Sequence, residues 1–265
     1  MLVWTRGGRA AVVTVFALVV AVVVVLPLLT VLVAGLASEW NGVLPSGLGG
    51  TRLADALAQD NQASLLVSVQ TALVAGVVAV VVGGWAAIAA PDAPGWLRRI
   101  TTAVFALPVA VPSVVIGLGV LIAFSRPPFV LNGTLWIVVL VHSVLVVAFA
   151  YATVGAGLAR LDPVYAQAAD SLGASPLCIL LTVRLPMLLP AFTAAFGLSF
   201  ALSMGELGAT IMVYPPGWRT LPVTIFALSD RGAALQAAAN TVVLLTATLL
   251  VSLLVGRIRG RAALR

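Results

Sequence analysis

The chain has 265 residues, of which 62% are hydrophobic and 8% charged, with a formal net charge of +6. With a mean hydropathy of +1.18 it is too apolar for one water-soluble core, so the sequence indicates an integral membrane protein. Lysine is absent, which excludes a Walker A loop; the single Cys178 excludes an internal disulfide, and the single His142 excludes paired-histidine zinc motifs.

Six apolar runs reach the length of about 20 residues that a helix needs to cross a bilayer. All six should be helical, because hydrocarbon offers no partner for unpaired backbone groups. The first run resembles a signal peptide in its flanking residues, but its apolar stretch exceeds the roughly 7 to 15 residues of a signal, which favours a retained span. In chain order the runs are Ala10–Leu36, Ser64–Ala90, Ile100–Phe124, Thr134–Leu158, Leu188–Val213 and Ala233–Val255.

The arginines select the orientation of the six spans. An even number of spans places both termini on one side, and cytoplasmic loops are the ones enriched in basic residues. With cytoplasmic termini, the inner arginines are Arg6, Arg9, Arg98, Arg99, Arg160, Arg184, Arg257, Arg259, Arg261 and Arg265; the outer ones are Arg52, Arg126, Arg219 and Arg231. The excess on one side predicts cytoplasmic termini.

A small amphipathic segment, "AQAADSLGASPLCILLTVRLP" at residues 166–186, separates the fourth and fifth runs. Asp162-Pro163 and Ser175-Pro176 each pair an N-cap residue with proline at the first helical position, which predicts two helix starts. Between them Gly173 stands where a helix C-terminal glycine is expected. The apolar face of the first helix suits either a partner protein or the lipid headgroups.

This segment resembles the cytoplasmic EAA loop of the permease subunits of ABC-type importers. That motif has Glu-Ala-Ala, three residues, glycine, nine residues and then Ile-x-Leu-Pro. The chain has Gln167, Ala168, Ala169, Gly173 and the sequence Val-Arg-Leu-Pro that ends at Pro186, all at matching spacing. It departs from the motif at Gln167, where the family has Glu, and at position 183, where Val replaces Ile.

The resemblance extends from about residue 62 to the C-terminus. The stretches "LPVAVPSVVIGLG" and "GELGATIMVYPPGWRTLPVTIF" are similar to the sulfate, molybdate and phosphonate branch, and "MVYPPGW" is most like permeases for 2-aminoethylphosphonate. The resemblance implies an all-α type I ABC importer permease fold in the inner membrane. It divides the chain into an N-terminal helix and outer loop (1–61), a permease core (62–258) with a coupling loop (159–186), and a basic cytoplasmic tail (259–265).

The resemblance also implies how such a subunit works. It binds no cofactor and has no catalytic or metal site; ATP is used by two cytoplasmic ATPase subunits, and the pathway is completed by a second permease chain, identical or related. An extracytoplasmic binding protein delivers the solute, and nucleic acid has no part. The residues expected to couple the loop to the ATPase are Tyr165, Gln167, Ala168, Ala169, Leu172, Gly173 and Pro186.

Glu206 is the single acidic residue inside the six runs, and a charge at the bilayer centre costs roughly 2.5–3.5 kcal/mol. It is interpreted either as part of the solute pathway or, preferably, as a structural hydrogen-bonding group held by helix amides or by an arginine of the following loop. Other polar residues could line a route at broken helices or simply pack. With Glu206, the candidates are Gln70, Ser113, Ser203 and Arg219.

Two other functional classes compete with an ATP-driven importer. A self-contained secondary transporter would use Glu206 and His142 for ion coupling, but it predicts inverted repeats and several buried charges, and the sequence has neither. A lipid-modifying enzyme would bring clustered acids or histidines to the interface, whereas the inner loops hold scattered single residues, Asp92, Asp162 and Asp170.

Overall fold

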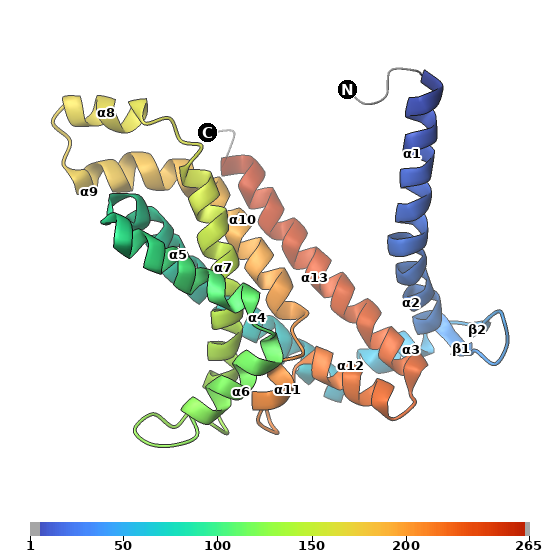
Figure 1. The fold of residues 1–265 in the computed structure, drawn as a ribbon. Helices are drawn as coiled ribbons and strands as arrows, with labels where there is room; N and C mark the ends of the chain where they lie inside the picture. Colours follow the sequence, from blue (N-terminus) through green and yellow to red (C-terminus); the bar gives the residue numbers. More distant parts are fainter. Residues whose placement is uncertain (1–5, 263–265) are drawn as a thin grey trace. The chain divides into compact units, whose positions relative to one another are not determined.

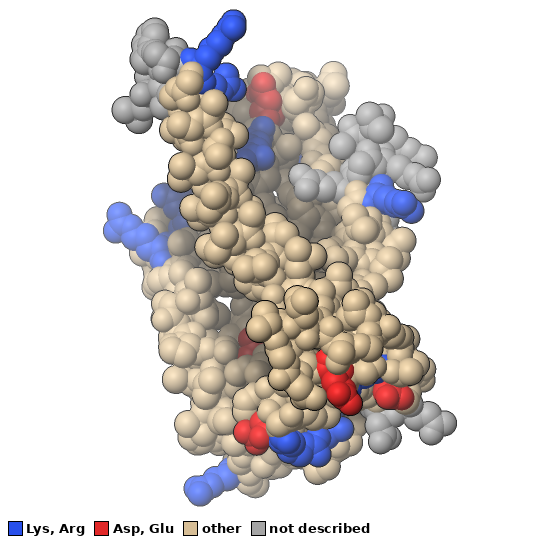
Figure 2. Space-filling view, turned by 90° about the vertical axis from the view of Figure 1, so that its right-hand side faces the viewer, with Lys and Arg blue, Asp and Glu red and all other residues tan. Residues whose placement is uncertain are grey.

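The computed structural model describes residues 6–262, and their side chains except at 59, 60 and 258–262. The predicted basic tail, 259–265, therefore lies outside the residues whose side chains are described. The chain forms two compact units: Met1–Gln62 with Thr224–Leu245, and Ala63–Val223 with Thr246–Arg265. Uncharged residues make up most of the face shown in Figure 2, as expected for a surface in contact with lipid.

The first unit begins with a long apolar helix and a small hairpin (Figure 1). The helix comprises α1 (Arg6–Val20), a π-helical turn η1 (Ala21–Val25) and α2 (Leu26–Leu36). An antiparallel pair follows, β1 (Ala37–Glu39) and β2 (Ser46–Leu48), and then α3 (Thr51–Ala56). Arg52 ties this hairpin down, because its guanidinium donates to the carbonyl oxygens of Ala37 at 2.8 Å and Ser38 at 2.5 Å.

The second unit contains most of the predicted spans. The helix α4 (Gln59–Ala89) starts in the first unit and ends in the 3₁₀ turn η2 (Ala90–Asp92). The helices α5 (Gly95–Ala110), α6 (Ser113–Ala123) and α7 (Leu135–Leu158) follow. The helices α5 and α6 meet at 109°. The predicted third span is therefore broken at Val111 and Pro112, where proline cannot donate the helical hydrogen bond.

The segment after α7 forms a helical hairpin, drawn in yellow to orange in Figure 1. Its first arm is α8 (Val164–Ser171); its second begins with α9 (Pro176–Ile179) and continues through the π-helical turn η3 (Leu180–Arg184) into α10 (Leu185–Met204). Short helices α11 (Thr210–Val213) and α12 (Leu221–Asp230) then precede α13 (Ala234–Ala262), which, like α12, has residues in both units.

The fifth predicted span was placed wrongly. Instead of Leu188–Val213, a single helix covers Pro176–Met204, and the chain breaks at residues 205–209 before α11. The second of the two predicted short helices is thus the start of this long helix. Among the described residues, five helices are long and apolar enough to span a membrane, or six when α5 and α6 are taken as one span.

Each π-helical turn is followed by one leucine and then a proline. In η1 and η3 the backbone N–H groups of Leu26 and Leu185 reach the carbonyl oxygens of Ala21 and Leu180, five residues back. The next residue is proline in each case, at 27 and 186. A proline ring clashes with the carbonyl four residues earlier, so a wider turn at this point accommodates it without ending the helix.

Glycines and alanines bring α4, α7 and α10 close together. A Cβ added to Gly83 would lie 2.8 Å from the Val147 carbonyl oxygen, and one added to Gly84 would lie 2.5 Å from the Phe192 ring. These two glycines therefore allow α4 to pack closely against α7 and α10. The core of these three helices consists of Ala79, Ala87, Ile88, Val146, Ala150, Val154, Leu188 and Ala195.

Candidate functional site

The helix α8 presents an uncovered face. Its N-terminus is capped as predicted, since the Val164 N–H donates to Asp162 Oδ1 at 3.0 Å. Tyr165, Ala168 and Leu172 share one side at helical spacing and are exposed, Tyr165 by 57% and Leu172 by 88%. Gln167 is also exposed and Ala169 half-buried. Together these side chains form an uncovered, partly apolar face on the first arm of the hairpin.

Gly173 ends this helix with the backbone conformation that the sequence predicts. Its φ is +82°, and a Cβ at this position would meet nothing within 4 Å. The Ala174 N–H reaches the Ala169 carbonyl oxygen at 3.1 Å, which closes the last turn. Glycine is therefore favoured here by the backbone conformation and not by crowding. Ser175 then caps α9, as predicted, by accepting from the Cys178 N–H at 3.3 Å.

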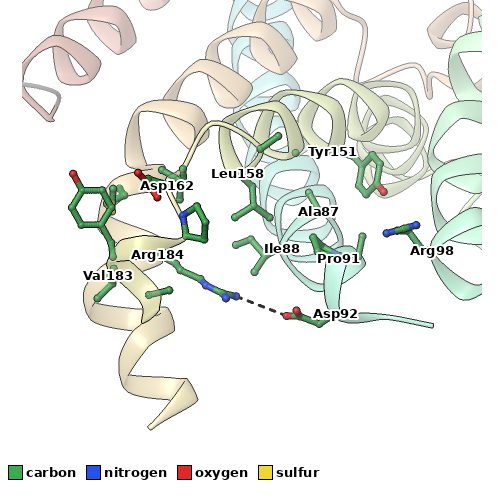
Figure 3. Close-up of a pocket in the computed structure, with 18 of the residues that line it drawn as sticks. Ala87, Ile88, Pro91, Asp92, Arg98, Tyr151, Leu158, Asp162, Val183 and Arg184 are labelled. Carbon is green, nitrogen blue, oxygen red and sulfur yellow. Dashed lines mark ion pairs between the residues drawn. The ribbon is translucent and has the colours of Figure 1, made fainter. Parts of the chain in front are cut away.

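A cavity of about 780 Å³ lies beside α8, between it and the ends of α4, α5 and α7 (Figure 3). In the close-up, Arg184 extends from its helix toward Asp92, which follows α4. Their closest nitrogen and oxygen atoms are 3.8 Å apart. Arg98 also lines the cavity, from α5, and Tyr151 donates to or accepts from Thr102 at 3.1 Å.

A second cavity, of about 250 Å³, lies at the C-terminal end of α10, beside the non-helical segment that follows it. His142, Ser203 and Glu206 line it. Glu206 stands in the break and not inside a helix as predicted; its Oε1 accepts from the Ala209 N–H at 2.7 Å. This contact is a hydrogen bond to a backbone amide in the turn before α11, and the role of Glu206 stays a prediction. Among the described residues, no ion pair joins Glu206 to Arg219 or Arg231.

His142 links α7 to both sides of the break. Its Nδ1 lies 2.7 Å from Ser203 Oγ, and its Nε2 lies 2.8 Å from Thr210 Oγ1. Because Thr210 donates its one hydroxyl hydrogen to the Glu206 carbonyl oxygen at 3.2 Å, it accepts from Nε2–H. In a neutral imidazole Nδ1 then accepts from Ser203. His142 thus joins α7 to Ser203 in α10 and to Thr210 in α11.

Of the remaining pathway candidates, one lies at the break after α10 and two lie elsewhere. Ser113 lies at the same break, because a Cβ added to Gly208 would come within 2.5 Å of its Oγ. Gln70 is exposed and Arg219 half-buried, and neither lines the 250 Å³ cavity. On the same helix as Gln70, Ser68 accepts from the Leu221 N–H at 2.7 Å and Thr71 from Trp218 Nε1 at 3.0 Å. These two residues anchor the loop before α12.

Sequence reasoning missed three residues of these sites. Thr210 carries no motif signal, since it comes close to His142 only through the break. Asp92 and Arg184 were counted only as loop charges. A signal existed for them: two opposite charges in successive loops assigned to the same side of the membrane are candidates for an ion pair.

Comparison with known proteins identifies the family. The sequence model of the family described as "Binding-protein-dependent transport system inner membrane component" matches residues 79–263. The chain belongs to this family of ABC importer permeases. It is therefore a multi-pass protein of the inner membrane, and the family match favours an ATP-driven importer over the secondary transporter that would use Glu206.

Named relatives cover nearly the whole permease. It is 45% identical over 261 residues to the putative 2-aminoethylphosphonate transport system permease protein PhnV of Salmonella typhimurium, a match that covers 98% of each chain. The same identity and coverage hold for PhnV of Salmonella paratyphi A. A more distant relative, the putative molybdenum transport system permease protein YvgM of Bacillus subtilis, is 26% identical over 63% of this chain and 80% of its own.

Solved structures share the fold of the permease. A chain of a bacterial ABC transporter involved in import of the acidic polysaccharide alginate matches with a TM-score of 0.73 at 12% identity, over 96% of this chain and 95% of that one. A chain of the MetNI methionine ABC transporter in an inward-facing conformation matches with 0.65 at 18% identity, over 75% and 94%. The predicted type I ABC importer permease fold is confirmed.

Proposed function

We propose that this permease carries 2-aminoethylphosphonate, or a closely related phosphonate or oxyanion, across the inner membrane. The observation that supports this cargo is the 45% identity to PhnV over 98% of both chains, since the more distant molybdenum relative covers much less of the sequence. An extracytoplasmic binding protein delivers the solute to a pathway formed by this chain and a second permease chain, identical or related.

The loop 159–186 is the proposed contact with the ATPase. Its support is the exposed face of α8, held between the Asp162 cap and the turn at Gly173. Tyr165, Ala168 and Leu172 would bury against a groove on the ATPase, with Gln167 at the rim and Pro186 starting the return into the membrane. Closure of two ATPase subunits on ATP would move two such helices together and rock the spans from inward-open to outward-open.

This mechanism requires cytoplasmic termini, as the arginine distribution predicts. The core, 62–258, then carries both the loop and the pathway, while 1–61 adds a helix and an outer loop, and 259–265 meets the anionic inner leaflet. Ser113, Ser203 and Glu206 gather at the broken helices, the kind of place where transporters form solute sites. Gln70 and Arg219 are proposed for the outer part of the route.

Uptake by the complete system tests the proposal. Cells that lack their own phosphonate uptake would express this permease with its binding protein and ATPase, and radiolabelled 2-aminoethylphosphonate would be followed with sulfate and molybdate as competitors. We expect accumulation that resists both competitors and stops when the ATPase carries an inactive nucleotide site. Accumulation without a functional ATPase would overturn the proposed mechanism, and uptake of only an inorganic oxyanion would overturn the phosphonate cargo.

A further inference from the structure

The ion pair between Asp92 and Arg184 joins two loops that the sequence keeps far apart. Asp92 ends the turn η2 between α4 and α5, and Arg184 ends the π-helical turn η3 of the coupling segment. The two side chains come within 3.8 Å while remaining 76% and 37% exposed, respectively. An ion pair so open to water adds little to stability. The ion pair is therefore of interest for the two segments that it joins.

Arg184 shares the lining of two cavities with other charged and polar residues of the coupling segment. It lines the 780 Å³ cavity with Asp162 and Arg98, and a neighbouring cavity of about 320 Å³ with Asp170. Gln167 lines both cavities as well. Of the three acids near Arg184, Asp162 is used as the cap of α8, since its Oδ1 accepts from Val164. Asp92 is the acid that pairs with Arg184.

The neutral side chain of Gln167 affects which acidic residue pairs with Arg184. A carboxylate there would line the same two cavities as Arg184 and compete with Asp92 for its charge. Because Gln167 has no charge, it does not compete with Asp92, in the turn before α5, for the ion pair with Arg184. The π-helical turn contributes too, because it changes the direction in which its last residue, Arg184, leaves the helix relative to an unbroken α-helix.

We propose that Asp92 and Arg184 are positioning residues for energy coupling, and that their ion pair links movement of the coupling segment to α5. The helix α5 begins three residues after Asp92 and leads to the 109° bend before α6. When the ATPase displaces α8, the pair pulls the start of α5 with it. This inference rests on the proposed function.

The test measures solute imported per ATP hydrolysed in the complete transporter reconstituted in liposomes. Asp92→Asn and Arg184→Gln should each lower this ratio several-fold while the complex still assembles and hydrolyses ATP. The charge-swapped double variant Asp92→Arg with Arg184→Asp should recover most of the ratio, and Arg184→Lys should keep part of it. Arg98→Gln is the matched control: it removes a guanidinium from the same cavity, and no ion pair of Arg98 is found in the described structure.

Two results would overturn the inference. One is an unchanged ratio in both single neutral variants, and the other is a charge-swapped variant no better coupled than they are. If Arg184→Gln fails to assemble, Arg184→Lys and the swapped pair still decide the question. Failure here is distinct from failure of the proposed function, because the wild-type complex must import solute with ATP before the ratio is defined.

Discussion

At the scale of single residues, the backbone angle at Gly173 decides how α8 ends. A φ of +82° is open to glycine but costs other residues about 1–2 kcal/mol, and more when the side chain is β-branched. Asparagine is the non-glycine residue that best tolerates this region. Since a Cβ here would touch nothing else in the described chain, a substitution acts within this chain through the backbone.

We therefore expect Gly173→Val to preserve membrane insertion but to lower solute-stimulated ATPase activity several-fold, whereas Gly173→Asn stays close to wild type. The reconstituted complex provides the measurement, and ATPase pull-down shows whether docking is lost. Equal activity in the valine and asparagine variants would show that the positive φ is not needed for coupling.

Glu206 offers a second residue-scale prediction. Gln can still accept from the Ala209 N–H with its side-chain oxygen, whereas Ala leaves that donor without its partner at a cost of about 1 kcal/mol. Glu206→Gln should thus retain uptake within about twofold, and Glu206→Ala should lower the melting temperature of the purified complex. Loss of uptake in the Gln variant with normal melting would instead place the charge itself in the solute pathway.

At the scale of elements, the contact of α4 with α7 depends on a missing side chain. A Cβ at Gly83 would lie 2.8 Å from the Val147 carbonyl oxygen and 2.9 Å from the Tyr151 nitrogen, both backbone atoms that cannot rotate away. Forcing the helices apart costs about 1–3 kcal/mol. Gly119 in α6 makes a useful contrast, because a Cβ there would meet nothing within 4 Å.

Gly83→Ala should therefore lower the melting temperature of the detergent-purified complex, and Gly119→Ala should leave it unchanged or raise it, since alanine favours a helix by about 1 kcal/mol over glycine. Thermal unfolding of the two variants beside the wild type gives the answer. Matching losses in both variants would mean that crowding at Gly83 is not what limits the contact.

Elements were predicted well where apolar length marks them and poorly where it does not. The runs at Ser64–Ala90, Thr134–Leu158 and Ala233–Val255 fall on α4, α7 and α13. The fifth run failed because residues 205–213 are apolar enough to continue it although the chain breaks there, and because residues 176–187 form a helix that hydropathy alone does not separate from the preceding loop. Hydropathy reports transfer to lipid, not the direction of the backbone.

In the candidate sites, contacts between sequence neighbours were predicted and contacts between distant residues were not. Local rules predicted the caps at Asp162 and Ser175 and the conformation of Gly173, since each depends on neighbours within a few residues. The hydrogen bonds of His142 to Ser203 and Thr210 join positions 61 and 68 residues apart. No spacing in the sequence encodes such a contact, because it depends on how the broken helix folds back onto α7.

At the scale of the whole molecule, one helix connects the proposed coupling loop with the broken region. Pro176–Met204 has 29 residues, which at about 1.5 Å per residue is roughly 43 Å, longer than the ~30 Å hydrocarbon core. It is therefore long enough to extend beyond the hydrocarbon; its first turn packs against α8, and its other end leads to Glu206. A displacement at α8 can thus reach the polar cluster around His142 through one continuous helix.

This arrangement works as an importer only if α8 faces the cytoplasm, and cysteine labelling can establish that. Cys178 is the single cysteine of the sequence and is exposed at the start of α9. Val43, in the hairpin between β1 and β2, is 93% exposed, so Val43→Cys in a Cys178→Ser background provides a matched site in the loop that the sequence predicts to be outside. A maleimide that cannot cross membranes should label Val43→Cys in intact spheroplasts, and Cys178 only after permeabilisation. Labelling of Cys178 in intact spheroplasts would put the loop outside, where no cytoplasmic ATPase can bind it.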